Sequence, residues 1–194
     1  MNKNPNYSIA IKVNKEIKNS KFDESCSKFF GKPCLPKSLL NKYSLDTIFL
    51  AQINCQDFAE LDPENRLPHK GYLYFFIEVK TKPYIEFNAI IDYILEEPEY
   101  IIDDFNDYSF MEGLNDAYLI SFEKKDAYYE GTKLLGYPTN DIDDTNDKNS
   151  LLLQYDPLDF DVTFLNTCDG YAFIFYNLNK KIKSFKTKLI VWSS

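Results

Sequence analysis

The chain has 194 residues, of which 44% are hydrophobic and 27% charged, and its mean hydropathy is -0.39. This balance is typical of one folded domain and excludes a disordered chain, and no apolar run approaches the roughly 20 residues that cross a bilayer. The formal net charge of -8 opposes binding to nucleic-acid phosphates and to anionic membrane surfaces. We therefore expect no nucleic acid and no membrane among its partners, and an acidic surface that would favour a basic protein.

The cysteines predict neither a disulfide framework nor a zinc site, because no two of them form a C-x-x-C pair: Cys26, Cys34, Cys55 and Cys168. The first twenty or so residues lack the apolar stretch of a secretory signal. We therefore expect reduced thiols in a cytoplasmic protein that needs no cofactor and no bound metal.

Short apolar runs rich in Tyr, Phe and Ile, separated by polar loops, are typical of strands. In chain order the predicted strands are residues 7–13, 47–54, 71–79, 84–94, 117–123, 151–156, 170–178 and 187–192. One helical turn is expected at 56–61 and a helix at 126–135. Residues 28–36 hold a glycine and two prolines, which predict a fixed extended corner. These elements predict a β-rich α+β fold.

Two segments align without a gap, which indicates an internal repeat. Residues 50–58 and 152–160 share Leu, Gln, Asp and Phe at matching places, and each segment is followed by a Gly-Tyr that opens an aromatic strand, at Gly71 and Gly170. A strand-turn-strand unit of this size cannot bury its apolar face alone. We therefore predict a single α+β domain in which two duplicated units share one core and are related by a pseudo-two-fold axis.

Six sequence blocks occur in an order that resembles the YwqG-like family of bacterial proteins of unknown function. They are S-K-F-F-G-K-P-C-L-P at 27–36, F-L-A-Q-I-N at 49–54, the block at 67–76, K-L-L-G-Y-P at 133–138, L-L-L-Q-Y-D at 151–156, and the block at 169–175. The chain departs from the family pattern at Phe30, which replaces a glycine, in the adjacent Asp169-Gly170 pair, in a missing tryptophan ahead of that pair, and in a short segment after Pro138. The resemblance implies a cytoplasmic setting and a duplicated β-rich domain over 27–194, with 1–26 as its N-terminal strand and connecting segment. It implies no activity.

The candidate binding residues are polar groups that recur with the repeat. Gln52 and Gln154 stand within apolar strands, where an amide without partners costs about 1 to 3 kcal/mol. Either each amide bonds to main-chain groups of an adjoining loop or of the other repeat, or the two share a ligand pocket. The other four residues either cap turns or gather as acid/base or metal-binding groups: Asn54, Asp57, Asp156 and Asp159.

Several other features carry weaker signals. The acidic segment 140–147 lacks the glycine and glutamate of a calcium loop, which predicts a solvated loop. The single histidine, His69, is expected to be exposed, with no nucleophile placed beside it. The glycines are isolated, which excludes the usual phosphate-binding loops. The lysine-rich segment 180–188 predicts either a protected edge strand or a docking strip for an acidic partner.

Two hypotheses of function follow. The first is a non-catalytic, cytoplasmic protein-interaction module, with an immunity-type protein that neutralises a toxin as one concrete version. The alternative is a hydrolase or metal-assisted enzyme that uses Asn54, Asp57, Asp156 and Asp159 in a central cleft. The two differ in whether those side chains converge on a pocket or act as caps.

Overall fold

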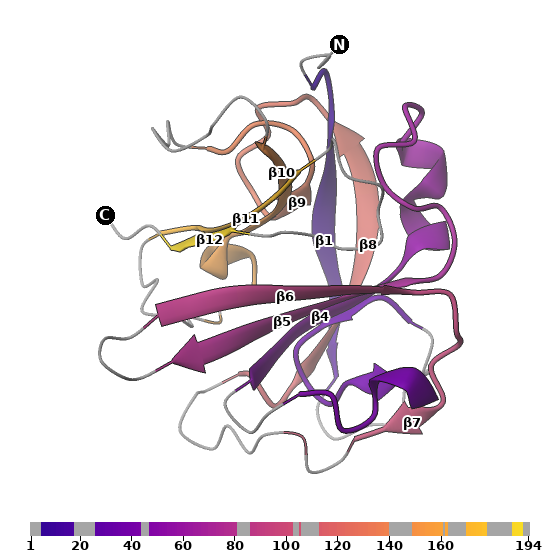
Figure 1. Cartoon of the computed structure of the whole chain (residues 1–194). Helices are drawn as coiled ribbons and strands as arrows, with labels where there is room; N and C mark the ends of the chain where they lie inside the picture. The colour runs from indigo at the N-terminus through magenta and orange to yellow at the C-terminus, as the bar shows by residue number, and fades with distance from the viewer. Residues whose placement is uncertain are drawn as a thin grey trace.

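The protein is built from one large curved sheet and a small second sheet, as the computed structural model shows (Figure 1). The structure describes residues 5–17, 26–43, 47–80, 86–102, 105, 113–139, 149–160, 162, 170–177 and 188–191. The predicted acidic loop 140–147, the lysines at 180–186 and Cys168 lie outside these residues.

The large sheet has ten strands in the order β12-β11-β10-β9-β1-β8-β2-β4-β5-β6. All its described pairings are antiparallel, and the edge strands β12 and β6 approach each other, so the sheet nearly closes on itself. The bounds are β1 (Ser8–Ile17), β2 (Lys28–Phe29), β4 (Thr47–Asn54), β5 (Tyr72–Lys80), β6 (Glu86–Ile94), β8 (Ala117–Lys125), β9 (Lys133–Leu134), β10 (Asn149–Tyr155), β11 (Ala172–Asn177) and β12 (Lys188–Val191).

The small sheet pairs β3 (Cys34–Leu35) with β7 (Tyr100–Ile101). Three short 3₁₀ segments complete the described structure: η1 (Lys37–Leu39), η2 (Cys55–Leu61) and η3 (Pro157–Asp159). Asn54, the last residue of β4, caps η2, and Asp156, the residue after β10, caps η3. Within the described ranges the chain forms no helix of the length and apolarity needed to cross a membrane.

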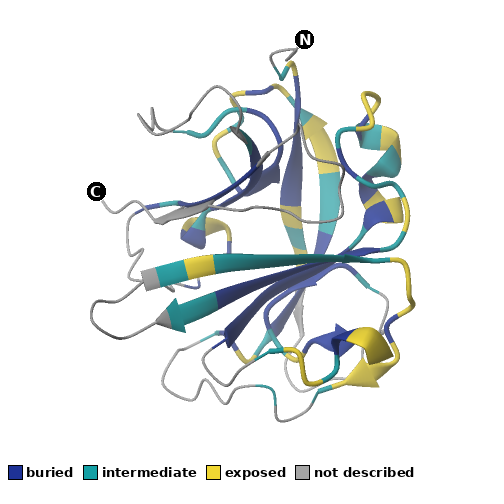
Figure 2. Cartoon of the chain, viewed as in Figure 1, coloured by how far each residue is buried: buried dark blue, intermediate teal, exposed yellow. Residues whose placement is uncertain are grey.

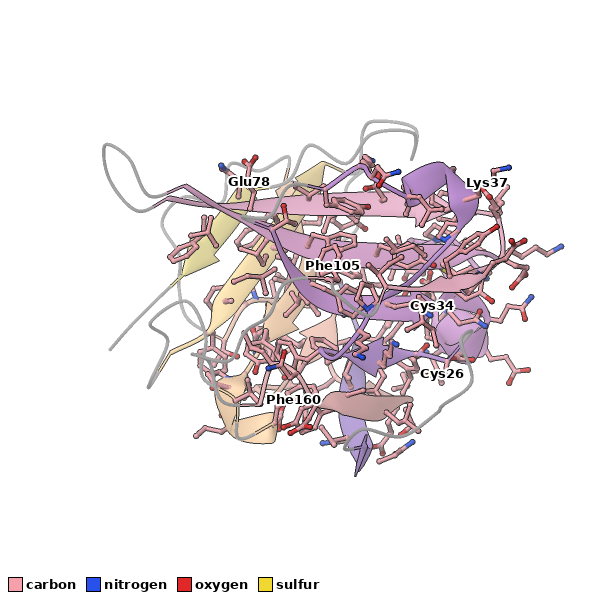
Figure 3. The ribbon with its side chains drawn as sticks, turned by 90° about the horizontal axis from the view of Figure 1, so that it is seen from below. Cys26, Cys34, Lys37, Glu78, Phe105 and Phe160 are labelled. Atoms are coloured by element: carbon pink, nitrogen blue, oxygen red, sulfur yellow. The ribbon has the colours of Figure 1, made fainter. Side chains whose placement is uncertain are left out.

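The near-continuous apolar run of β5 is explained by burial on both faces. Leu73, Phe75 and Ile77 enter the main core inside the curved sheet. Tyr72, Tyr74 and Phe76 alternate with them and face outward, where they pack in a second cluster with Leu35 and Leu39 from the segment that carries β3 and η1. Figure 3 shows Phe105 lying over the same strands. The small sheet therefore lies against the outer face of β4 and β5.

Aromatic side chains from β2, β8, β10 and the end of η3 pack together in the main core. The Phe29 ring lies 5.9 Å from the ring of Tyr155 and 4.7 Å from that of Phe160. Phe30 and Tyr118 add edge contacts to this group. Stacked and edge-to-face pairs of this kind contribute beyond their buried area, on the order of 1 kcal/mol each. Strand β2 is thereby fixed to β10 and η3 across the core.

The α+β prediction was wrong, because the described residues form strands joined by turns and 3₁₀ segments. The helix expected at 126–135 is instead a turn followed by β9, where Lys133 and Leu134 pair with β1 and β10. Sheet pairing supplies the main-chain hydrogen bonds there, so a weak helical pattern is overridden. The structure does not show the predicted internal duplication. It shows one continuous sheet in which two places share similar local contacts.

Candidate functional site

Gln52 lies on β4 between Lys28 of β2 and Tyr74 of β5, and none of it is exposed to solvent. Its side-chain oxygen accepts a hydrogen bond from the main-chain N–H of Cys34 at 3.2 Å. Its amide nitrogen donates to the main-chain oxygen of Cys26 at 3.3 Å. The side chain thus ties the segments on either side of β2 to β4. Figure 3 marks Cys26 and Cys34, the two residues that it joins.

Gln154 lies on β10 beside Lys133 of β9 and is equally buried. Its oxygen accepts the main-chain N–H of Thr139 at 3.0 Å, and its nitrogen donates to Thr139 Oγ1 at 2.6 Å. The same nitrogen also donates to the main-chain oxygens of Glu130 and Gly131. Each glutamine therefore bonds to a loop that adjoins its own strand, which is one of the two alternatives that the sequence left open.

The residues that follow each glutamine cap the next 3₁₀ segment. Asn54 Oδ1 accepts the main-chain N–H of Gln56 at 3.1 Å, and Asp156 Oδ1 accepts that of Leu158 at 3.0 Å. This is the usual role of Asn and Asp at the start of a helical turn. Burial, with Asp159 nearby, raises the pKa of Asp156 above its ordinary value.

The last two candidate residues bind hydroxyl residues just ahead of β2 and β9. Asp57 Oδ2 accepts the Ser27 hydroxyl at 2.5 Å, and Ser27 Oγ accepts the main-chain N–H of Asn54 at 2.9 Å. Asp159 Oδ2 accepts the main-chain N–H of Thr132 at 2.6 Å, and Thr132 Oγ1 accepts that of Asp156 at 2.9 Å. We call these places the Gln52 corner (Ser27, Lys28, Gln52, Asn54, Asp57) and the Gln154 corner (Thr132, Lys133, Gln154, Asp156, Asp159).

A buried lysine stands in each corner, and neither was among the residues predicted from the sequence. Lys28 Nζ donates to the main-chain oxygen of Lys32 at 2.6 Å, and Lys133 Nζ donates to that of Tyr129. Neither lysine is exposed. Burial lowers the pKa of Lys133 from 10.5 to about 8, although Asp126 and Glu130 act in the opposite sense. The signal was present in the paired strings K-F-F-G-K-P and K-L-L-G-Y-P, in which the lysine takes the same place.

Each lysine strand ends in an unusual turn. Phe30 and Gly31 both have positive φ, and so do Leu135 and Gly136. At Gly31 a Cβ atom would lie 2.9 Å from the Ala117 Cβ, so the close approach there requires glycine. The turn directs the chain from the interior strand β2 to β3 outside the sheet, and Gln52 then fixes β3 in place.

The two corners do not form one site. In the sheet order, β9, β1, β8 and β2 separate β10 from β4. The hydrogen bonds of each corner run within that corner or to the loops beside it, as those of Asp57 with Ser27 and of Asp159 with Thr132 do. Among the described residues, no three His, Cys, Asp or Glu side chains gather to hold a metal ion. The structure brings the candidate residues together in two separate groups of three.

A further polar centre surrounds Asp62, which is fully buried in the loop after η2. Its carboxylate accepts the Tyr7 hydroxyl and the main-chain N–H groups of Arg66 and Leu67, the last at 2.8 Å. Burial raises the pKa of Asp62, but these hydrogen bonds outweigh it and hold the pKa below its ordinary value. The expectation that His69 is exposed was wrong, because its Nε2 lies 3.1 Å from Asp62 Oδ2 and its side chain is only 28% exposed.

The fold and the two corners define a β-rich protein whose conspicuous polar side chains hold loops against strand ends. Residues 27–100 match the family described as Domain of unknown function (DUF1963). That stretch is less than half of the chain, and it contains the Gln52 corner, both strands of the small sheet up to Tyr100, and the Asp62 loop. No curated protein and no solved structure matches the chain.

Proposed function

We propose that this chain is a YwqG-like protein of bacterial, cytoplasmic type that acts without catalysis, by binding another protein. One observation carries the proposal: all six candidate polar residues make hydrogen bonds that fix the fold. A ligand at either corner would have to break bonds to main-chain groups such as the N–H of Cys34 or Thr139, each worth about 1 kcal/mol. Recognition is then expected at the surface.

Charge favours a basic partner. The net charge of -8 gives a field that attracts cationic proteins and speeds their association at low salt. A concrete version is an immunity-type protein that neutralises a basic toxin by covering it. In that case the two proteins form a stoichiometric complex, and the affinity falls as salt screens the charges.

The enzyme hypothesis makes a different demand on the same residues. A hydrolase or metal-assisted enzyme built on Asn54, Asp57, Asp156 and Asp159 needs these groups around one reacting centre. Their present partners are Gln56, Ser27, Leu158 and Thr132, in two separate corners. The specific observations therefore favour the binding role.

The test is to purify the protein from its native cell after mild crosslinking, then rebuild each captured complex from purified components. The binding proposal expects one partner that forms a stoichiometric complex, measured by light scattering and calorimetry, with an affinity that weakens as salt rises. Asp57→Asn and Asp159→Asn should leave that affinity unchanged as long as the fold is intact. Absence of any partner that can be rebuilt, or hydrolytic turnover abolished by these two substitutions, would contradict the proposal.

A further inference from the structure

Strand β7 presents apolar side chains on the outside of the molecule. Tyr100 is 40% exposed and Ile101 is 37% exposed, while Leu95, a few residues earlier, is 68% exposed. Figure 2 shows β7 as an exposed strand beside η1, on the outside of the molecule. Exposed apolar groups clustered on one segment are a feature of interaction surfaces.

The opposite edge of this small sheet is already closed. Cys34 of β3 donates its main-chain N–H to the side chain of Gln52, and its main-chain oxygen accepts the Tyr74 hydroxyl at 3.0 Å. Both partners come from the outer face of the large sheet. Strand β3 therefore cannot accept another strand on that side, and β7 is the outer strand of the pair.

The register shows which groups of β7 point outward. Cys34 lies opposite Ile101, and the Ile102 N–H donates to the Pro33 oxygen at 3.0 Å beside that pair. In an antiparallel ladder, two opposite residues that do not bond to each other are flanked by hydrogen-bonded pairs. Each of these two residues directs its own N–H and C=O groups away from the other strand. The N–H and C=O of Ile101 thus face away from β3, and they have no hydrogen-bond partner within the described part of the chain.

Acidic side chains lie in the chain just before this edge strand. Glu96, Glu97 and Glu99 lie in the segment that leads into β7, and all three are exposed. Glu97 also accepts the Tyr72 hydroxyl at 2.6 Å, which holds the segment to β5. A strand that adds to β7 would place its side chains near these carboxylates, so lysine or arginine on that strand would be favoured.

We propose that the open edge of β7 binds an extended, lysine- or arginine-rich segment of a partner protein, which adds to the small sheet as a third strand. The partner's main chain bonds to Ile101, its apolar side chains contact Leu95 and Tyr100, and its cations lie near Glu96 and Glu99. This is strand addition, in which main-chain bonds give affinity and side chains give specificity. The inference deepens the proposed function by naming its surface and the chemistry of its partner.

The experiment uses a fluorescent peptide of alternating lysine and valine, with two matched probes: alternating glutamate and valine, and the lysine peptide with a methylated main chain. Binding to the full chain is followed by fluorescence anisotropy. The lysine peptide should bind, and the other two should bind at least about tenfold more weakly, because one reverses the charge and the other removes main-chain donors.

Two variants locate the site. Ile101→Pro removes the outward N–H and keeps the bond from Ile102 to Pro33, because proline is accepted at an outward position of an edge strand. This variant should bind the lysine peptide about tenfold more weakly than the wild type does. Glu96→Lys should lower the affinity for the lysine peptide about threefold. Glu60→Lys on η2 makes the same change of charge elsewhere and should lower that affinity less. Circular dichroism checks that Ile101→Pro remains folded, and Glu96→Lys tests the surface independently of it.

Equal binding of the three probes, or equal effects of Glu96→Lys and Glu60→Lys, would overturn the inference. So would a dimer in light scattering that the lysine peptide does not dissociate, because a second copy would then occupy the edge. These outcomes are separate from the proposed function, which fails if no captured partner can be rebuilt into a complex, or if Asp57→Asn and Asp159→Asn abolish a hydrolytic activity. A natural partner whose affinity is unchanged by Ile101→Pro and Glu96→Lys would leave the proposed function intact and reject the β7 edge.

Discussion

The side-chain oxygen of Gln52 accepts the main-chain N–H of Cys34 at 3.2 Å, although Gln52 belongs to the large sheet and Cys34 to the small one. This bond, together with that from Tyr74 to the Cys34 oxygen, fixes the small sheet on the outer face of β4 and β5. The buried amide is therefore a structural element of the surface that we propose to bind a partner.

Replacing Gln52 by leucine should lower the free energy of unfolding by about 1 to 3 kcal/mol, because the bonds to Cys34 and Cys26 are lost from a buried place. Urea denaturation measures the change. Gln56→Leu is the control, since Gln56 is exposed on η2 and should change stability by less than about 0.5 kcal/mol. Similar small effects of both substitutions would show that the Gln52 bonds contribute little.

Gln154→Leu should be destabilising by a similar amount, and its effect should add to that of Gln52→Leu. Gln52 bonds to Cys26 and Cys34, whereas Gln154 bonds to Glu130, Gly131 and Thr139. Four strands of the sheet lie between β4, which carries Gln52, and β10, which carries Gln154. Effects at such separated sites usually add to within about 0.5 kcal/mol. A double variant whose loss departs from the sum by more than about 1 kcal/mol would mean that the two corners are coupled, as a shared site requires.

Asp62→Asn should lower the free energy of unfolding by roughly 2 to 4 kcal/mol at neutral pH, because a buried carboxylate loses part of its hydrogen bonding. The folded-state pKa of Asp62 lies below its unfolded value. Its stabilisation is thus present above about pH 4 and is lost as pH falls through the folded pKa. The difference in the free energy of unfolding between wild type and Asp62→Asn, measured by urea denaturation, should become smaller in acid. A difference that is constant with pH would contradict this role.

Lys133→Met tests the buried lysine. The pKa of Lys133 is about 8 in the folded chain, against 10.5 ordinarily, so between these values the unfolded chain binds more protons than the folded one. The stability of the wild type should therefore rise relative to Lys133→Met from about pH 8 to pH 10. Lys37→Met is the matched control, because Lys37 is exposed and points away from the fold (Figure 3), so it removes a lysine without changing the buried core.

The sequence predicted most strands because apolar runs bounded by turn residues determine them. Residues 47–54 form β4 at the predicted bounds, and the predicted turn at 56–61 lies within η2. The expectation that the two glutamines find partners was confirmed, since burial leaves an amide no alternative. The binding role of the six candidate residues stays a prediction.

The errors have physical causes. Lysine is usually exposed, so the sequence alone does not predict the burial of Lys28 and Lys133. Lys28 bonds to the main-chain oxygen of Lys32, after β2, and Lys133 to that of Tyr129, before β9. His69 was expected in solvent because its carboxylate partner, Asp62, is fixed by the loop fold and not by any sequence pattern. The helix at 126–135 was predicted from local pattern alone, whereas contacts of β9 with β1 and β10 decide the conformation there.

Amide hydrogen exchange in the free protein, followed by NMR at single residues, shows whether β3 is held by Gln52 and whether the outer edge of β7 is open. The N–H of Cys34 should exchange slowly because Gln52 accepts it, and the N–H of Ile101 should exchange fast because it faces outward on β7. Gln52→Leu should speed exchange at Cys34 and leave Ile101 unchanged. Slow exchange at Ile101 would contradict the account, because that edge would then already be covered.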